Sequence, residues 1–305
     1  MSTIERPAPR ATSSAPASDI ADRISELVTC GSIEMTAHKP DEPRELASLL
    51  PAGTKVYVTH LPRHSLAMTL AALEAVHQAG LEPVPHIAAR RIAARDELKE
   101  FLERAVRAAG VRKVLLIGGD DPQPIGPYAD STALIREGIL ADCGVREVGI
   151  AGYPEGHPRI PRAALEVAMT EKLRLAAVQS LGSYIVTQFS FAPARVVEYC
   201  DELAKRVPTV PVYVGMAGPT EPATLLKFAQ RCGVSASLRA LRDQGFGVIR
   251  MVTHTDPSEQ LVALARYCLA HRTCNVVGTH FFTFGGAARA AAWINRMIAT
   301  RAAAG

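Results

Sequence analysis

Short runs of β-branched and other apolar residues alternate along the chain with longer segments in which apolar positions recur at helical spacing. Runs of the first kind predict strands buried on both faces, and segments of the second kind predict helices with one apolar face. The predicted strands cover residues 31–37, 55–61, 82–88, 113–120, 147–155, 184–191, 210–218 and 275–284. The predicted helices cover residues 42–50, 65–79, 95–109, 130–142, 161–181, 194–206, two segments within 221–243, 257–271, and a last one from Ala287.

This alternation predicts a (β/α)8 barrel of the TIM type, folded as a single domain. An open, doubly wound sheet is the alternative, but no G-x-G-x-x-G follows an early strand and no P-loop is present. Residues 1–20 are rich in Pro, Ala and Ser, and we expect them to be a disordered lead-in. Residues 21–305 then form the barrel.

The composition narrows the class of protein. Of the 305 residues, 48% are hydrophobic and 21% are charged, which is typical of a soluble globular protein. The net charge of +4 is spread along the chain without long basic runs, so no nucleic-acid partner is expected. No apolar stretch approaches the length of a membrane span, and the six cysteines show no zinc-type spacing. We therefore expect a cytoplasmic protein with reduced thiols and no membrane partner.

Polar side chains recur where the predicted strands end. In a barrel these ends meet on one face, where such barrels carry out their chemistry. The residues concerned are Glu34, Thr59, His86, Asp120, Tyr153, Glu155, His157 and Gln188, together with the segment GTHFFTFGG (278–286). Any one of them alone is more often a loop hydrogen-bonder than a catalyst, but their recurrence favours a site at this face.

Glu34 lies within the apolar run SIEMT (32–36). Burial disfavours the ionised form of a carboxyl group, so we expect a raised pKa and a candidate general acid. The alternative is a carboxylate paired with a neighbouring Arg or Lys. Gln188 raises a related question, because an amide inside the predicted strand 184–191 needs hydrogen-bond partners if it is buried.

The stretch LIGGDDPQP (116–124) offers a second candidate. The adjacent residues Gly118 and Gly119 would let a ligand approach the backbone closely, and Asp120 follows at once. Asp121 is more typical of an ordinary tight turn.

The stretch AGYPEGHP (151–158) combines an aromatic, an acid and an imidazole within eight positions. Glu155 and His157 have no third ligand nearby, and the other histidines show no metal spacing. We therefore expect no metal at this site.

The motifs SIEMT, PHIAAR, LIGGDDPQP, AGYPEGHP and IVTQFSF, in this order, resemble those of the methylenetetrahydrofolate reductase family. Members of that family are flavin-dependent barrels that make 5-methyltetrahydrofolate, and the resemblance runs from about Gly31 to Phe284. It implies an oxidoreductase with FAD as cofactor and NADH or NADPH as reductant. It also implies 5,10-methylenetetrahydrofolate as the small-molecule substrate.

The resemblance further implies roles for individual residues. Glu34 corresponds to the general acid that opens the five-membered ring of the folate, and Asp120 corresponds to an acid near the flavin. Gln188 corresponds to the glutamine that hydrogen-bonds the pterin ring. The implied flavin site comprises Thr59, His86, Gly119, Asp120, Tyr128, Ala129, Tyr153 and His157, with Lys172 or Arg174 near the diphosphate.

The chain departs from the family pattern at Gly118, where members commonly carry an arginine. A barrel that binds folate or flavin without reductase activity, as the partner of a methyltransferase, is therefore the alternative function. The same site running in the oxidative direction is another alternative. The sequence does not decide between NADH and NADPH, or whether the chain forms a homo-oligomer. Phe281, Phe282 and Phe284 are expected to pack in the barrel wall rather than against a ligand.

Overall fold

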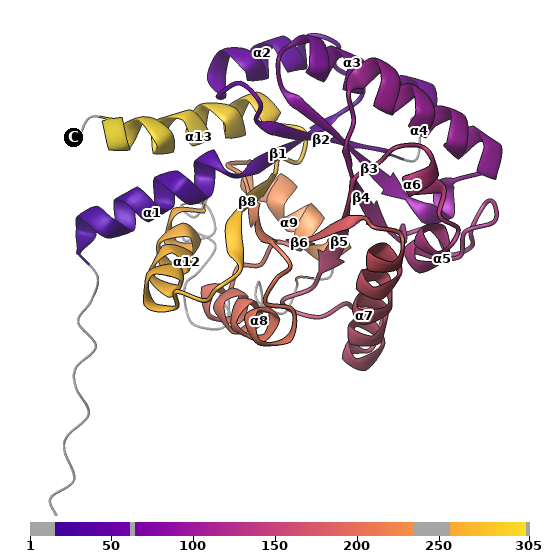
Figure 1. The fold of residues 1–305 in the computed structure, drawn as a ribbon. Helices are drawn as coiled ribbons and strands as arrows, with labels where there is room; N and C mark the ends of the chain where they lie inside the picture. Colours follow the sequence, from indigo (N-terminus) through magenta and orange to yellow (C-terminus); the bar gives the residue numbers. More distant parts are fainter. Residues whose placement is uncertain (1–15, 62–64, 233, 235–256, 303–305) are drawn as a thin grey trace, which may run out of the picture.

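The computed structural model describes residues 16–61, 65–232, 234 and 257–302 of the chain. In this part, eight parallel strands close into a barrel in which sequence neighbours pair and β8 returns to β1 (Figure 1). The predicted (β/α)8 fold is confirmed. The strands are β1 (Ser32–Thr36), β2 (Lys55–Thr59), β3 (Glu82–Ala88), β4 (Lys113–Ile117), β5 (Glu147–Gly152), β6 (Gly182–Thr187), β7 (Val212–Ala217) and β8 (Val276–Phe282).

Helices surround the barrel (Figure 1). No helix among the described residues has both the length and the hydrophobicity needed to cross a membrane. The described helices are α1 (Ala17–Thr29), α2 (Glu42–Leu49), α3 (Leu66–Gln78), the 3-10 turn η1 (Ala89–Arg91), α4 (Arg95–Ala109), α5 (Ser131–Arg136), α6 (Ile139–Asp142), α7 (Arg162–Val178), α8 (Pro193–Arg206), α9 (Pro222–Cys232), α12 (Ser258–Ala270) and α13 (Ala287–Ala302).

Two predicted helical regions differ from the structure. The helix α1 begins at Ala17 and packs against α12 and α13, so residues 17–20 are helical and not part of the lead-in; residues 1–15 lie outside the described residues. The predicted helix 130–142 is two helices, α5 and α6, because Gly138 between them takes a φ of 82° that a helix cannot contain. The second half of the prediction for 221–243 also lies outside the described residues.

Several strands end earlier than predicted, because the apolar run continues into the loop on the carboxyl face of the barrel. β4 ends at Ile117, β5 at Gly152 and β6 at Thr187. Gln188 therefore follows its strand directly and does not lie within it. The loop positions gained in this way are the positions at which barrels carry their functional side chains.

Side chains along each strand alternate between the barrel interior and the layer of helices. On β2, Val56 and Val58 belong to the large core shared with the helices, whereas Tyr57 belongs to a separate cluster inside the barrel. Tyr57, Tyr184 and Tyr213 form the tyrosine layer across the middle of the barrel, where the rings of Tyr184 and Tyr213 meet edge to face at 5.8 Å. The layer is completed by Val84, Leu115 and Val186.

Charged side chains lie at the amino-terminal end of the barrel, on the first residues of four consecutive strands: Lys55, Glu82, Lys113 and Glu147. The Nζ of Lys113 lies 3.0 Å from Oε1 of Glu147 and 4.0 Å from Oε1 of Glu82. The Nζ of Lys55 lies 5.3 Å from the ring centroid of Tyr213. We call these four residues the lysine–glutamate ring, whose alternating signs neutralise one another.

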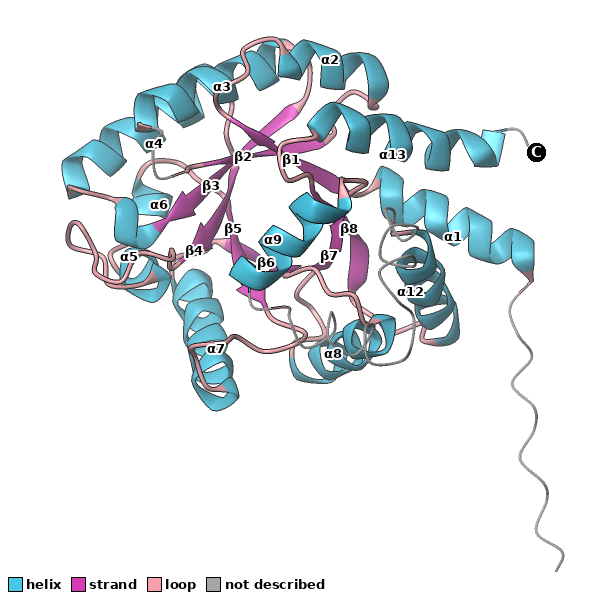
Figure 2. Cartoon of the chain, turned by 180° about the vertical axis from the view of Figure 1, so that it is seen from behind, coloured by secondary structure: helices cyan, strands magenta, loops and turns pink. Residues whose placement is uncertain are grey.

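Aromatic side chains pack at the opposite, carboxyl face, where α9 crosses the strand ends (Figure 2). The ring of Phe189 lies 5.5 Å from that of Phe282 and 5.3 Å from that of Phe284. Ala229 of α9 belongs to the same cluster. Phe281 is fully buried on the helix side of β8 and packs against Trp293 at 5.6 Å, as predicted for a residue of the barrel wall.

Candidate functional site

Glu34 lies at the centre of a polar cluster inside the barrel. Its Oε1 lies 3.5 Å from Nδ1 of His86 on β3 and 3.5 Å from Nε2 of His280 on β8. Strand alternation brings these residues together, because all three occupy inward positions of their strands. The side chains of Glu34 and His86 are 13% and 15% exposed, whereas that of His280 is 0% exposed. His280 therefore lies deeper in the barrel than the carboxylate it contacts.

The ring of His280 is fixed by contacts with three neighbouring residues. Its Nδ1 lies 2.8 Å from the Oγ of Ser32. The ring meets Tyr57 edge to face at 4.7 Å and Phe282 at 4.8 Å. Sequence reasoning did not single out Ser32, and it included His280 only within the segment GTHFFTFGG (278–286). The period of two along a strand could have identified both, since each lies two residues from an inward position.

The pKa of Glu34 shifts in the opposite direction to the prediction. Burial alone raises it, but the hydrogen bonds and charges of His280 and His86 outweigh burial and lower the pKa from 4.5 to about 2. The carboxyl group is therefore an anion in the resting site, paired with histidines and not with an Arg or Lys. The prediction of a raised pKa was wrong because a linear sequence does not show that two histidines from distant strands reach the same carboxylate.

Thr59 lies opposite His86 in the register of β2 and β3. The Oγ1 of Thr59 donates a hydrogen bond to the carbonyl of Met35 at 3.2 Å, so this hydroxyl is already engaged with the barrel. The Nε2 of His86 is buried without a hydrogen-bond partner. A buried polar atom of this kind is available to a ligand group at the face of the barrel.

The loops after β3 and β4 are held together by two arginines of η1. Arg91 Nε lies 2.6 Å from Oδ2 of Asp121, and Arg91 Nη1 donates to the carbonyl of His60 at 3.2 Å. Arg90 donates to the carbonyls of Ala129 at 2.8 Å and Asp121 at 2.9 Å. Asp121, predicted to be only a turn former, is thus the carboxylate that anchors this part of the site.

Asp120, unlike Asp121, pairs with Arg159 in the loop after β5. Its side chain is 62% exposed, and Oδ1 lies 3.5 Å from Nη2 of Arg159. Tyr153 and His157 meet edge to face at 5.4 Å in the turn after β5. Burial, followed by the charge of Arg159, lowers the pKa of His157, which favours its neutral form. The predicted residues Asp120, Tyr153 and His157 therefore share one rim of the carboxyl face.

Gln188 finds its partners locally. Its Oε1 accepts a hydrogen bond from the backbone N–H of Phe189 at 3.1 Å, and its own backbone N–H donates to the carbonyl of Gly152 at 2.7 Å. These bonds hold the residue at the end of β6 and leave the half-buried amide with hydrogen-bonding capacity beyond the one lone pair in use.

Tyr128 lies in the core. Its side chain is 3% exposed and its hydroxyl bonds Glu137, which also pairs with Arg95. Burial, reinforced by Glu137, raises the pKa of Tyr128. Ala129 is exposed and its carbonyl is bonded to Arg90. The role of both residues at a flavin site stays a prediction, and for Tyr128 the backbone is the part left to make such a contact.

Two cations of α7 were candidates for a diphosphate contact. Arg174 pairs with Glu171 on its own helix at 2.8 Å and is 59% exposed. Lys172 is half-buried, and burial lowers its pKa, an effect that the charge of Asp130 partly offsets. Lys172 is therefore the one of the two that lies near the loop after β4.

The residues present fit the flavin that the family resemblance implies. Gly119 has a φ of 96°, and a Cβ on Gly118 would meet no atom within 4 Å, so the backbone of the turn after β4 lies beside open space. The buried Nε2 of His86 offers such a ring a polar partner. For the diphosphate, Arg90 and Arg91 are committed to the loops, and Lys172 is the cation that remains of those named above.

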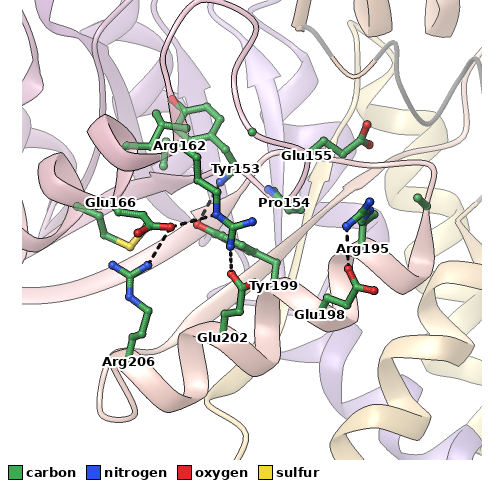
Figure 3. Close-up of a pocket in the computed structure, with 15 residues that line it drawn as sticks. Tyr153, Pro154, Glu155, Arg162, Glu166, Arg195, Glu198, Tyr199, Glu202 and Arg206 are labelled. Carbon is green, nitrogen blue, oxygen red and sulfur yellow. Dashed lines mark hydrogen bonds and ion pairs between the residues drawn. The ribbon is translucent and has the colours of Figure 1, made fainter.

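A cavity of about 500 Å3 lies behind the turn after β5, between α7 and α8 (Figure 3). Its walls carry an ion-pair network in which Arg162 bonds Glu166 and Glu202, while Arg206 lies 3.6 Å from Glu166. The hydroxyl of Tyr199 accepts a hydrogen bond from the backbone N–H of Tyr153 at 3.2 Å. Tyr199, in the wall of the cavity, thus supports the turn after β5, and the arginines of the wall named here are paired with glutamates.

A closed parallel barrel with carboxylate, imidazole and amide side chains at the carboxyl ends of its strands is the arrangement of a TIM-barrel enzyme. The family model for methylenetetrahydrofolate reductase matches residues 44–284. The chain belongs to that family, as its motifs predicted.

Named relatives match part of the chain. Methylenetetrahydrofolate reductase 2 of Saccharomyces cerevisiae is 26% identical over 159 residues, which cover 50% of this chain and 26% of that protein. The 5,10-methylenetetrahydrofolate reductase of Pectobacterium carotovorum subsp. carotovorum is 26% identical over 172 residues, covering 56% of this chain and 53% of that protein. The matches therefore span about a quarter and about half of these relatives.

A solved structure shares the fold. It is a protein from Clostridium thermocellum described as binding two copies of 5-methyl-5,6,7,8-tetrahydrofolic acid. Its TM-score to this chain is 0.57 at 11% sequence identity, and the match covers 88% of this chain and 94% of that one. At this identity the likeness concerns the fold alone.

Proposed function

We propose that this chain reduces 5,10-methylenetetrahydrofolate to 5-methyltetrahydrofolate, with NADH or NADPH as reductant and FAD as cofactor. The observation that carries the proposal is the carboxylate of Glu34, held between two histidines at the active face of a barrel of this family. The folate bound by the Clostridium thermocellum protein of the same fold supports a folate ligand here.

Ring opening is the step that needs a side chain of this chain. The methylene bridge joins N5 and N10 of the folate, and protonation of N10 breaks the bridge to leave an electrophilic iminium at N5. Glu34 is the carboxyl group placed to deliver that proton. Because its pKa is lowered to about 2, it must first receive a proton from a neighbour.

The other residues of the face bind and orient the reactants. Thr59, His86, Gly119 and the rim of Asp120, Tyr153 and His157 would hold the flavin, with Lys172 near the diphosphate. When bound, FAD supplies hydride transfer between the nicotinamide and the methylene carbon. Asp120 would stabilise positive charge that develops on the pterin. The amide of Gln188 would donate to and accept from the edge of the pterin ring.

One observation favours a second direction for the same site. A carboxylate that is ionised at rest is ready to accept a proton from N10, which is what oxidation of 5-methyltetrahydrofolate requires of it. Both directions share one transition state, so the resting ionisation affects which pH suits each direction and not whether it occurs.

An absorbance spectrum of the purified protein tests the proposal, followed by anaerobic addition of NADH, or NADPH in parallel, and then of 5,10-methylenetetrahydrofolate. We expect a flavin band that bleaches with the nicotinamide and returns with the folate. A colourless protein that still reduces folate would refute the flavin part alone. A protein that binds 5-methyltetrahydrofolate in calorimetry but shows no turnover in either direction would support the binding-barrel alternative instead.

A further inference from the structure

Three cysteines from separate elements gather near the amino-terminal end of the barrel. Cys200 comes from α8, Cys268 from the last turn of α12, and Cys274 from the turn just before β8. Cys200 and Cys268 are buried, whereas Cys274 is half-buried, and all three are free thiols. The helix α1 packs against both α12 and β8, so it lies beside this cluster (Figure 1).

Cys268 and Cys274 are in direct contact, because their sulfurs share a hydrogen bond. The backbone N–H of Val276 also donates to the sulfur of Cys274. From α1, the guanidinium of Arg23 donates to the sulfur of Cys268, and its Nη2 donates to the carbonyl of Val276 at 3.2 Å. A cation and N–H donors therefore surround the pair, and such an environment stabilises a thiolate.

The two sulfurs differ in the form that they favour. The hydrogen bond from Cys268 lowers the pKa of Cys274 and outweighs burial, and the N–H of Val276 and the charges of Arg23 and His271 lower it further. The same hydrogen bond, followed by burial, raises the pKa of Cys268. Cys268 also lies in the last turn of α12, where the helix dipole disfavours an anion. Cys274, the more exposed of the two, is therefore the thiolate, and Cys268 is the thiol that donates to it.

The turn between the two cysteines can let the sulfurs approach each other. Two sulfurs that share a hydrogen bond lie farther apart than the bond length of about 2.05 Å in a disulfide, so the chain must move slightly before they can join. Residues 271–273 are exposed, which leaves them room to move. Asn275, in contrast, is held by its side-chain amide, which donates to the carbonyls of Val207 at 3.0 Å and Val210 at 2.7 Å. The movement therefore falls on the turn and not on β8.

We propose that Cys268 and Cys274 form a reversible dithiol–disulfide site that reacts with low-molecular-weight disulfides, with Cys274 as the attacking sulfur and Cys268 as the resolving one. This site lies at the opposite end of the barrel from Glu34 and does not depend on the proposed function. Buried cysteines also serve as small apolar side chains. An apolar role requires neither the guanidinium of Arg23 nor the N–H of Val276 at the sulfurs.

The exchange balances in atoms and electrons. The thiolate of Cys274 attacks one sulfur of the reagent; a mixed S–S bond forms, and the S–S bond of the reagent breaks to release one thiolate with its electron pair. Cys268 gives its proton to that thiolate and attacks the Sγ of Cys274. The mixed bond breaks, and the second thiolate leaves and takes a proton from solvent. The protein loses two electrons, and the reagent gains them as its disulfide becomes two thiols.

Oxidised glutathione is the probe that tests the pair in the natural chain. The reduced protein is incubated with it without denaturant, its remaining thiols are trapped with N-ethylmaleimide, and tryptic peptides are weighed by mass spectrometry. Trypsin cleaves after Arg266, Arg272 and Arg289, so the two cysteines fall on separate peptides, 267–272 and 273–289. We expect these peptides to be joined by a disulfide that reduction separates, in a protein that stays a single chain on a non-reducing gel.

The exposed Cys30 is the internal control of this experiment, because it is the described cysteine most open to solvent. It should carry glutathione as a mixed disulfide that no neighbouring thiol resolves. If peptides 267–272 and 273–289 stay unjoined at a glutathione concentration that modifies Cys30, the proposal is overturned.

Single substitutions separate the roles of the two sulfurs. In Cys268→Ser, glutathione should remain attached to Cys274, because no thiol is left to resolve it. In Cys274→Ser, Cys268 should react at least about 10-fold more slowly than Cys274 does in the natural chain. Cys200→Ser is the matched control, since it removes the third thiol of the cluster and should leave the joined peptides. Glutathione that accumulates on Cys268 and not on Cys274 would overturn the assignment.

Arg23 gives a test that a merely structural role for the cysteines would not pass. Arg23→Gln should slow the alkylation of Cys274 by iodoacetamide at pH 7 about threefold, because the thiolate loses a neighbouring cation, and Arg23→Lys should restore most of the rate. The rate is followed on peptide 273–289 of the folded protein. If Cys274 of the natural chain reacts no faster than the exposed Cys30, it is not an activated thiolate and the proposal fails.

Discussion

The two ends of the barrel carry polar clusters that differ in how their charges are balanced. At the amino-terminal end, the lysine–glutamate ring pairs permanent cations with carboxylates that reach solvent, Glu147 being 38% exposed. At the carboxyl end, Glu34 is 13% exposed and its partners are histidines, whose charge depends on pH. Charges that cancel at every physiological pH serve the fold, whereas a cluster whose charge depends on one proton is suited to proton transfer.

Removing the carboxylate at the active end should have the largest effect. Glu34→Gln keeps the shape of the side chain but cannot relay a proton, so folate turnover should fall by at least about 10²-fold. Reduction of the bound flavin by NADH should persist, because it does not use this proton. Stopped-flow absorbance separates the two half-reactions.

The matched control is Glu147→Gln in the lysine–glutamate ring, which should retain folate turnover. If Glu34→Gln and Glu147→Gln turn over folate equally well, the two ends do not differ in function and the role of Glu34 is lost.

Acid should remove the contribution of Glu34 to the free energy of unfolding within a defined pH range. The pKa of Glu34 in the folded chain, about 2, lies below its ordinary value of 4.5. The stabilisation is therefore fully present above pH 4.5 and is lost as pH falls toward 2. The shift corresponds to about 3 kcal/mol of free energy of unfolding at most, at about 1.4 kcal/mol for each pH unit.

Urea unfolding of the natural chain and of Glu34→Gln at several pH values measures this loss. The difference in free energy of unfolding between the two should narrow steadily between pH 5 and pH 2. A difference that stays constant over this range would contradict the lowered pKa.

Removing a cation at the opposite end should affect stability and not activity. Lys113→Met leaves Glu82 and Glu147 without their shared partner, and we expect a loss of about 1–2 kcal/mol in the free energy of unfolding. kcat for folate should remain unchanged. Lys99→Met on α4, where the lysine is 48% exposed and pairs with Glu103 at 3.8 Å, is the control and should cost less than about 0.5 kcal/mol.

Gln188→Ala should have the smallest effect of these substitutions, and it tests whether the carboxyl end of the barrel binds the pterin ring. Loss of the hydrogen bonds to the pterin should raise KM for folate about 10-fold, which corresponds to about 1.4 kcal/mol. The flavin spectrum should be unchanged. Gln179→Ala, at the end of α7 and bonded to the carbonyl of Ile135, is the control and should leave KM as it was.

The alternation of apolar runs with helical patterns was enough to predict the barrel, because a strand buried on both faces appears in the sequence as a continuous apolar run. The site was only partly predictable. Glu34 and His86 were found as polar residues at strand ends, whereas Ser32 was missed and His280 was included only within the segment GTHFFTFGG (278–286), without a role of its own. Their importance arises from closure of the barrel, which places β8 beside β1.

The direction of the Glu34 pKa shift and the position of Tyr128 were beyond sequence reasoning for the same reason. Burial and partners act in opposite directions on a carboxyl group, and only tertiary contacts decide which is larger. Tyr128 was placed on a loop, yet its ring enters the core and bonds Glu137. A loop residue in sequence is not always a surface residue in the fold.

The tyrosine layer places uncharged side chains between the charged clusters at the two ends of the barrel. Burial raises the pKa of Tyr57, Tyr184 and Tyr213, the last to about 12, so the layer carries no charge at physiological pH. It separates the lysine–glutamate ring at the amino-terminal end from Glu34 and its histidine partners at the carboxyl end. We therefore expect salt that screens the charges of the exposed ring to change the pKa of Glu34 little.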